Sequence, residues 1–177
     1  MTAPPSRRLS AVRAVAIDLD GALGDTRSLW ESWLEEAARR YASIAPLDPA
    51  SLPRDRGRAA RNLDRWAQRG IGDWRQALAR HAEERAPLHL RPDPTAGAAL
   101  RNLVRQGIRV GVFTDAPEPL ARVALSHLGA LRRVDRLETG EGALQRLLAT
   151  LGEDARVVHD GGQLALVAGQ TETERSR

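Results

Sequence analysis

The stretch AVAIDLDGALGDT, residues 14–26, joins a short apolar run to two closely spaced acids and a glycine. The apolar run, residues 11–18, is typical of a buried parallel strand. In an open parallel sheet, functional side chains gather at the carboxyl ends of the strands, which is where Asp18 and Asp20 stand. Their i, i+2 spacing on extended backbone predicts that both carboxylates point to the same side. Gly21 then allows the chain to turn sharply, so the stretch predicts a site at the end of the first strand.

The chemistry available to this pair follows from its charge. Two carboxylates this close repel each other unless a cation lies between them, and a divalent ion with hard oxygen ligands, Mg²⁺ above all, meets that need. An aspartate can also attack phosphorus to form an acyl-phosphate, while a second aspartate protonates the leaving oxygen and later activates water. Asp18 and Asp20 are therefore candidate nucleophile, acid–base group and metal ligands. The alternative for a bare pair of this kind is a plain acidic strand end.

The rest of the chain alternates between strand and helix patterns. Three helical patterns are bounded by a Pro at their start, a Gly after their end, or both. Strands that alternate with helices predict βα units on a parallel sheet, and hence an α/β fold. The expected strands are residues 107–114, 131–137 and 155–160, and the expected helices are residues 94–106, 117–128 and 141–151.

Residues 27–90 are predicted to form an all-helical insert directly after the first strand. They show three helical patterns, no strand pattern, all four tryptophans and the only tyrosine, Tyr41. These aromatic residues are interpreted as the core of a small bundle, with the walls of a substrate pocket as the alternative. The expected organisation is a flexible lead at residues 1–10, a core of residues 11–26 and 91–166, and a flexible tail at residues 167–177.

Composition narrows the classes of partner. All 27 basic residues are Arg, the net charge is only +4, and the arginines alternate with acids rather than cluster, which argues against a nucleic-acid partner. No apolar run approaches the ~18 residues that a membrane span needs. Cysteine is absent, so neither disulfides nor thiolate metal sites are expected. The sequence predicts a cytoplasmic protein and leaves its oligomeric state open.

Residues 14–26 resemble motif I of the haloacid dehalogenase-like (HAD) superfamily, an apolar strand followed by DxDGTLxDS/T, with Ala22 in place of the usual Thr. The run GIRVGVFTDA, residues 107–116, is similar to motif II. The resemblance implies that Thr114 and the backbone N–H of Asp115 bind a substrate phosphoryl group. It also implies a HAD-like Rossmannoid three-layer core with a parallel sheet, to which residues 27–90 add a helical C1-type cap.

The later motifs depart from the family pattern. Motif III normally supplies a Lys, but the chain has none, and the usual position falls near Glu138. Arg136 is the nearest candidate cation for phosphate, with a plain surface arginine as the alternative. In VVHDGGQLAL, residues 157–166, Asp160 is the expected motif IV metal ligand, with a plain loop acid as the alternative. His159 replaces the usual Gly and is interpreted as filling space, and no second acid follows within five residues.

The leading functional hypothesis is a Mg²⁺-dependent phosphatase that acts on a small phosphorylated metabolite. As the resemblance implies, Asp18 attacks phosphorus, Asp20 acts as acid and then as base, and Asp18, Asp20 and Asp160 hold the metal. Thr114, Asp115 and Arg136 bind the phosphoryl oxygens. One alternative is a catalytically impaired HAD-like protein that binds a ligand or a protein partner. Another is dehalogenation by the same ester chemistry, which the DGALGDT run fits less well.

Overall fold

The fold is built on a parallel sheet of four strands in the order β3-β2-β1-β4. In this computed structural model, which describes residues 12–44 and 48–175, the strands are β1 (Ala14–Asp18), β2 (Arg109–Thr114), β3 (Arg136–Thr139) and β4 (Arg156–Val158). The predicted α/β class with a parallel sheet is confirmed. The third strand begins later than predicted because residues 131–133 form a short 3-10 turn. The predicted lead, residues 1–10, lies outside the described residues.

Helices cover both faces of the sheet and make three layers. Val15 and Ile17 belong to the larger core, which includes α4 (Pro94–Arg105), α5 (Glu118–His127) and α7 (Gly161–Arg175). Ala14 and Ala16 point to the other face and pack with α6 (Ala143–Leu151). This alternation along β1 is the period of two that a strand imposes. Asp18 is two residues after Ala16 and four after Ala14, so its side chain leaves the strand on the same face, toward α6.

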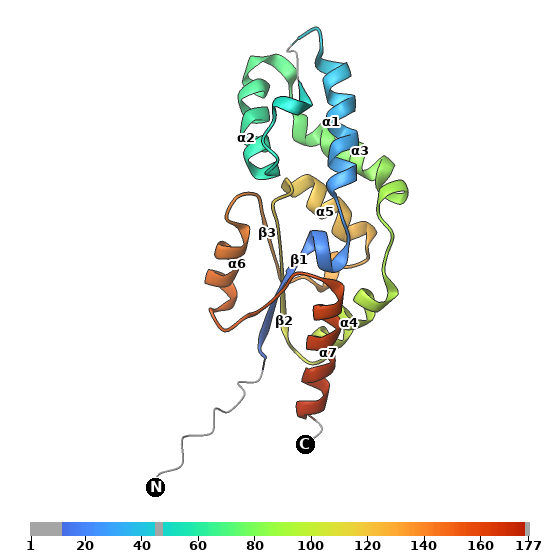
Figure 1. Ribbon diagram of the computed structural model, residues 1–177, viewed down its shortest axis with the longest axis vertical. Helices are drawn as coiled ribbons and strands as arrows, with labels where there is room; N and C mark the ends of the chain where they lie inside the picture. Colours follow the sequence, from blue (N-terminus) through green and yellow to red (C-terminus); the bar gives the residue numbers. More distant parts are fainter. Residues whose placement is uncertain (1–11, 45–47, 176–177) are drawn as a thin grey trace.

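Residues 27–89 contain three long helices and lie beyond the carboxyl ends of the strands (Figure 1). The helices are α1 (Arg27–Tyr41), α2 (Arg56–Trp66) and α3 (Trp74–His89). Trp33 and Trp74 are buried between them with ring centroids 5.8 Å apart, and Trp30 stacks on Trp33 at 5.2 Å. The interpretation of these three tryptophans as the core of a bundle is therefore confirmed, although Trp30 also lines the main cavity.

The predicted flexible tail is wrong where it begins. Helix α7 runs unbroken from Gly161 to Arg175, and Val167 and Ala168 are buried in the larger core. The Asn102 side chain of α4 donates a hydrogen bond to the Ala168 carbonyl at 2.9 Å. The apolar run LALVA supplies a face that packs on α4. This packing stabilises the helix past residue 166. Among helices within residues 12–44 and 48–175, none is long and apolar enough to cross a bilayer.

Candidate active site

Asp18 and Asp20 stand at the mouth of the same cavity, but not on the same extended strand. Strand β1 ends at Asp18, and residues 19–23 form a π-helical turn in which Asp20 has φ −85° and ψ 19°. The expectation that both side chains project from extended backbone is therefore wrong for Asp20, which lies in the turn after the strand. The turn instead brings the Asp20 N–H to Asp18 Oδ1, at 3.1 Å. Both residues line a cavity of about 870 Å³ between the sheet and the helical insert.

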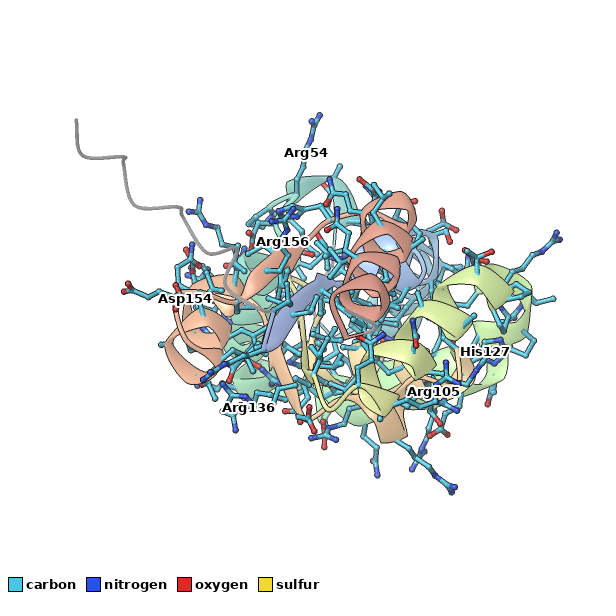
Figure 2. All side chains as sticks on the ribbon, turned by 90° about the horizontal axis from the view of Figure 1, so that it is seen from below. Arg54, Arg105, His127, Arg136, Asp154 and Arg156 are labelled. Atoms are coloured by element: carbon cyan, nitrogen blue, oxygen red, sulfur yellow. The ribbon has the colours of Figure 1, made fainter. Side chains whose placement is uncertain are left out.

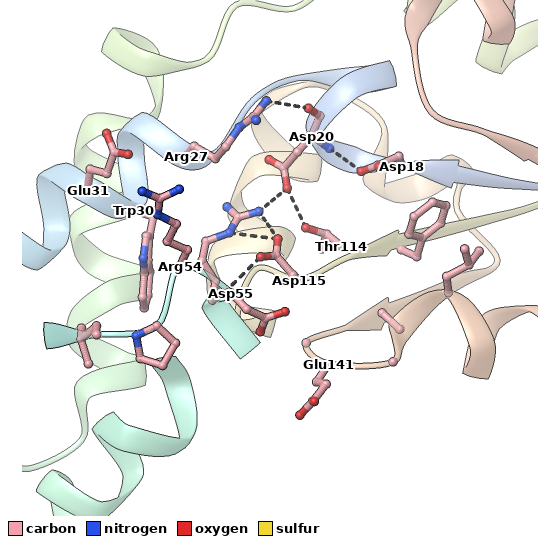
Figure 3. A pocket seen from close by; sticks show the side chains of 18 of the residues that line it. Asp18, Asp20, Arg27, Trp30, Glu31, Arg54, Asp55, Thr114, Asp115 and Glu141 are labelled. Carbon is pink, nitrogen blue, oxygen red and sulfur yellow. Dashed lines mark hydrogen bonds and ion pairs between the residues drawn. The ribbon is translucent and has the colours of Figure 1, made fainter. Parts of the chain in front are cut away.

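The Asp20 carboxylate is enclosed by hydrogen-bond donors, of which Figure 3 labels Thr114. Its Oδ1 accepts from the N–H and hydroxyl of Thr26, at 2.7 and 2.6 Å. Its Oδ2 accepts from the Thr114 hydroxyl at 2.7 Å and from Arg56 Nη2 at 2.5 Å. Burial works to raise the pKa of Asp20, but the charge of Arg56 and the hydrogen bonds from Thr26 and Thr114 outweigh it, so its pKa lies below the usual value. Asp20 is thus held as a carboxylate with both oxygens engaged.

Strand β2 places Thr114 and Asp115 on the same cavity. The Thr114 side chain is buried, and its hydroxyl accepts the Ala116 N–H at 3.1 Å while donating to Asp20. Asp115 follows the strand, and its carboxylate faces the guanidinium of Arg56. The structure therefore brings together Asp18, Asp20, Thr114 and Asp115 from two neighbouring strand ends, as parallel topology requires.

Arg56, the first residue of α2, is a residue of this site that sequence reasoning missed. Its side chain is only 4% exposed. Besides Asp20, its guanidinium contacts Asp115 through Nε and Nη2 and donates from Nη1 to the Thr26 hydroxyl at 2.6 Å. Its backbone N–H also donates to Asp115, at 3.1 Å. The motif RDRGR places an arginine at a helix start beside a glycine, but nothing local tells it apart from the chain's other arginines.

The start of α2 is seated against the loop that follows β3. Arg58 and Arg61 pair with Glu141 of that loop. A Cβ added at Gly57 would stand 2.5 Å from the Glu141 nitrogen and 3.0 Å from the Gly140 carbonyl carbon. Only glycine therefore permits this approach of helix to loop, and the approach carries Arg56 to Asp20.

Replacing Gly57 by Ala tests that approach. Alanine should stabilise an exposed helix by about 1 kcal/mol relative to glycine. Because its Cβ collides with backbone atoms, we expect the opposite sign here, a loss of about 1–3 kcal/mol of unfolding free energy. Urea unfolding measures the change, and hydrogen exchange should show faster exchange in α2. Gly97→Ala in α4 is the matched control, because an added Cβ there would meet only the flexible Arg101 side chain, at 3.4 Å. If Gly57→Ala stabilises the protein, the close approach of Gly57 to the backbone of Gly140 and Glu141 is contradicted.

Arg136 is not brought to the cavity. It begins β3, so it lies three residues before the carboxyl end at Thr139, roughly 10 Å away at 3.3 Å per residue. Its side chain is 55% exposed and pairs with Glu138 at 2.7 Å, and it lies at the margin of the molecule in Figure 2. Glu138 also pairs with Arg146 of α6, at 3.0 Å. Arg136 is therefore a surface arginine, the alternative given above, and its guanidinium is paired with Glu138.

Glu138→Gln should destabilise the protein in a pH-dependent way. Burial works to raise the pKa of Glu138, but Arg146 and Arg136 outweigh it and hold the pKa below its usual value. The contribution is therefore present above the unfolded-state pKa, about 4.3, and is lost as the pH falls through the lower folded-state value. We expect a loss of about 1 kcal/mol at neutral pH, vanishing well below about pH 4. Urea unfolding at both pH values measures it, with the exposed Glu118→Gln as control. An equal loss at both pH values contradicts the pairing.

Asp160 is not the residue of β4's end that lies beside Asp18; His159 is. Asp160 Oδ1 accepts the Gln163 N–H at 2.8 Å, at the start of α7, and Asp160 does not line the cavity. His159 Nδ1 instead lies 3.4 Å from Asp18 Oδ2. The register explains this, because Ile17 pairs with Val158 and the next residues, Asp18 and His159, therefore lie opposite each other. Asp160 is one residue further along and turns away.

The cavity offers two oxygen donors of the kind that hold a hard divalent cation. Asp18 offers a carboxylate and Asp20 a backbone carbonyl, and Mg²⁺ is commonly held by one or two protein oxygens together with water and substrate phosphate. Within the described parts of the chain, no three acidic, histidine or cysteine side chains are grouped to hold a metal. The predicted set of Asp18, Asp20 and Asp160 therefore does not come together, because Asp18 and Asp20 line the cavity and Asp160 does not.

Cations reach the cavity from the insert. The basic residues among its lining are Arg27, Arg54 and Arg56, all within residues 27–90, and Figure 3 labels the first two. Arg27 Nη2 donates to the Asp20 carbonyl at 3.3 Å. An anionic substrate would therefore meet carboxylates and a threonine on the sheet side and guanidinium groups on the insert side.

Comparisons with known proteins identify the family of the chain. A family model described as haloacid dehalogenase-like hydrolase matches residues 12–158. A phosphoglycolate phosphatase of Rhodospirillum rubrum is 33% identical over 170 residues, which cover 81% of this chain and 68% of that protein. Among solved structures, CbbY from Rhodobacter sphaeroides in complex with phosphate has a TM-score of 0.59 at 18% identity, covering 89% of this chain and 83% of that one.

A second solved structure, a putative phosphoglycolate phosphatase from Lactobacillus plantarum, has a TM-score of 0.53 at 15% identity, over 90% of this chain and 84% of that one. At such identities the two structures support the fold alone. The family model and the Rhodospirillum relative go further, since one matches most of the chain and the other is related in sequence over most of its length. The chain therefore belongs to the haloacid dehalogenase-like hydrolases.

Proposed function

We propose that this hydrolase is a Mg²⁺-dependent phosphatase that cleaves a small phosphomonoester through an aspartyl-phosphate on Asp18. The observation that supports this best is the composition of the cavity. Asp18 enters it from a strand end, with Asp20 and Thr114 beside it and the guanidinium groups of Arg54 and Arg56 on the insert side. A nucleophilic carboxylate that faces anion-binding groups suits an ester that is itself an anion.

The proposed reaction has two steps. Asp18 attacks phosphorus, the bond from phosphorus to the ester oxygen breaks, and the leaving oxygen takes a proton from Asp20. Asp20 then takes a proton from water, whose oxygen attacks phosphorus and breaks its bond to Asp18, releasing inorganic phosphate. Thr114 and the backbone N–H of Asp115 are proposed to bind the phosphoryl oxygens. Asp18 and the Asp20 carbonyl would hold Mg²⁺, which when bound would supply positive charge for the phosphoryl group.

Arg56 must move during this cycle. In the first step Asp20 acts as an acid, so its carboxylate must first take up a proton, which a phosphomonoester bound as its monoanion can supply. That proton must sit on an oxygen that Arg56 and Thr114 now occupy. Incoming phosphoryl oxygens compete with Asp20 for the guanidinium, so substrate entry frees the carboxyl group to act. Residues 27–90 are proposed to act as a cap that closes over the cavity and excludes water during transfer.

The Rhodospirillum relative suggests which substrate to test first. Its name states phosphoglycolate as its substrate, and we propose that this chain acts on a phosphomonoester of comparable size. Phosphate release should be measured on phosphoglycolate, on other small phosphomonoesters and on an aryl phosphate, with and without Mg²⁺. Release that needs Mg²⁺ supports the proposal. Inactivity on the whole panel at millimolar substrate overturns it.

A catalytically impaired binding protein is the second candidate. Two observations favour it, namely that the described residues bring no core cation to the cavity and that Arg56 already neutralises Asp20. This candidate predicts saturable binding of phosphate or phosphoglycolate, measured by calorimetry, with no turnover. Magnesium-dependent hydrolysis at an ordinary enzymatic rate rejects it.

A further inference from the structure

His159 stands in a row of residues that crosses the sheet at the level of the nucleophile. Glu138 pairs with Phe113, and Phe113 pairs with Asp18. The pairing of Ile17 with Val158 places His159 next in the same row, after Asp18. Side chains at one level of a parallel sheet point to the same face. His159 is thus brought to Asp18 by the register of β4 on β1, and the contact joins residues 141 positions apart.

The backbone of His159 is held where the imidazole can reach the carboxylate. Its N–H donates to the Gln163 side chain at 2.9 Å. A Cβ on Gly21 would stand 2.1 Å from the His159 carbonyl oxygen, so the turn after Asp20 and the end of β4 touch backbone to backbone. A residue fixed in this way has little freedom to drift from its neighbour.

The ring itself is oriented from one side by an aromatic contact. Phe113 and His159 meet edge to face, with centroids 5.7 Å apart and planes inclined by 82°, a preferred geometry for aromatic pairs. The Nδ1 atom then lies 3.4 Å from Asp18 Oδ2. With its proton on Nδ1, the imidazole donates to this oxygen while the Asp20 N–H donates to Oδ1.

We propose that His159 is a positioning residue, which together with the Asp20 N–H fixes the plane of the Asp18 carboxylate for attack on phosphorus. An aspartate χ2 torsion is broad when unconstrained, and one donor on each oxygen narrows it. This role rests on the proposed function, because it assumes that Asp18 is the nucleophile. It differs from the space-filling interpretation, which any residue of similar size would satisfy.

Two substitutions separate the roles. His159→Leu keeps bulk and removes the donor, whereas His159→Asn places an amide nitrogen near the Nδ1 position. We expect kcat for an aryl phosphate to fall on the order of tenfold in His159→Leu, the worth of one hydrogen bond, with KM little changed. His159→Asn should recover most of the loss. His89→Leu is the control, because His89 contacts Ser28 outside the cavity. Since the His159 side chain is 56% exposed, all variants should fold, which thermal melting verifies.

A binding measurement makes the inference independent of turnover. Beryllium fluoride mimics a phosphoryl group bonded to an aspartate, and its binding with Mg²⁺ can be followed by fluorine NMR. We expect weaker binding in His159→Leu and recovery in His159→Asn. If kcat and beryllium fluoride binding are unchanged in His159→Leu, the inference alone is overturned. The same holds if His159→Leu lowers kcat and His159→Asn does not recover it. Absence of both turnover and fluoride binding in the unaltered protein overturns the inference and the proposed function together.

Discussion

Asp18→Asn should lower magnesium-dependent phosphate release by about 10⁴-fold or more, the scale on which removal of a nucleophile acts. The amide is neutral and cannot form the acyl-phosphate, so only direct attack by water, helped by the remaining groups of the cavity, is left. The fold should be unaffected, because Asn has the size of Asp and its carbonyl oxygen can still accept the Asp20 N–H. Initial rates on phosphoglycolate and an aryl phosphate measure the loss.

Asp25→Asn is the matched control for this experiment. Asp25 lies in the same stretch, but its side chain is 55% exposed, pairs with Arg27 and is absent from the cavity lining. The same chemical change there should leave the rate within about twofold, since exposed ion pairs contribute little. Reductive trapping of an acyl-phosphate with borohydride, followed by peptide mass spectrometry, should label Asp18. Activity that survives Asp18→Asn, or a label on another residue, contradicts the assignment.

Arg56→Gln should cost stability on the order of 3 kcal/mol, the usual consequence of removing one partner from a buried ion pair. Asp20 is only 12% exposed and would lose its counter-charge. Asp115 would lose the Arg56 guanidinium with which it pairs. The loss should appear in urea unfolding near neutral pH, where Asp20 is ionised. It should be accompanied by faster hydrogen exchange in α2, because Arg56 ties that helix to two strand ends.

Arg58→Gln provides the comparison for Arg56. Arg58 lies on the same helix, but its side chain is 60% exposed and pairs with the half-exposed Glu141, so the cost should be below about 1 kcal/mol. If the two variants lose equal stability, the burial of Arg56 has no energetic consequence. Arg56→Lys should recover only part of the loss, because one ammonium group cannot replace the separate Nε, Nη1 and Nη2 donors that reach Asp115, Thr26 and Asp20.

The sequence located one half of the site well. An apolar run that ends in Asp18 and another that ends in Thr114 can be recognised locally, because strand patterning depends on near neighbours in the chain. Parallel topology then brings both ends to one edge without further information. The same reasoning erred where a strand ended early, as at Asp20, and where a strand began at the candidate residue itself, as at Arg136.

By itself, then, the sequence determined the α/β class, the helical insert and the position of Asp18 at a strand end, since each depends on local periodicity. Only the tertiary structure decided which charges meet. Arg56 reaches Asp20 across 36 positions because Gly57 lets α2 pack against the loop that follows β3, and His159 reaches Asp18 across 141 because β4 pairs with β1 in one register. Such contacts depend on how separate elements pack, and an arginine or a histidine at an element end has no local pattern that names its partner.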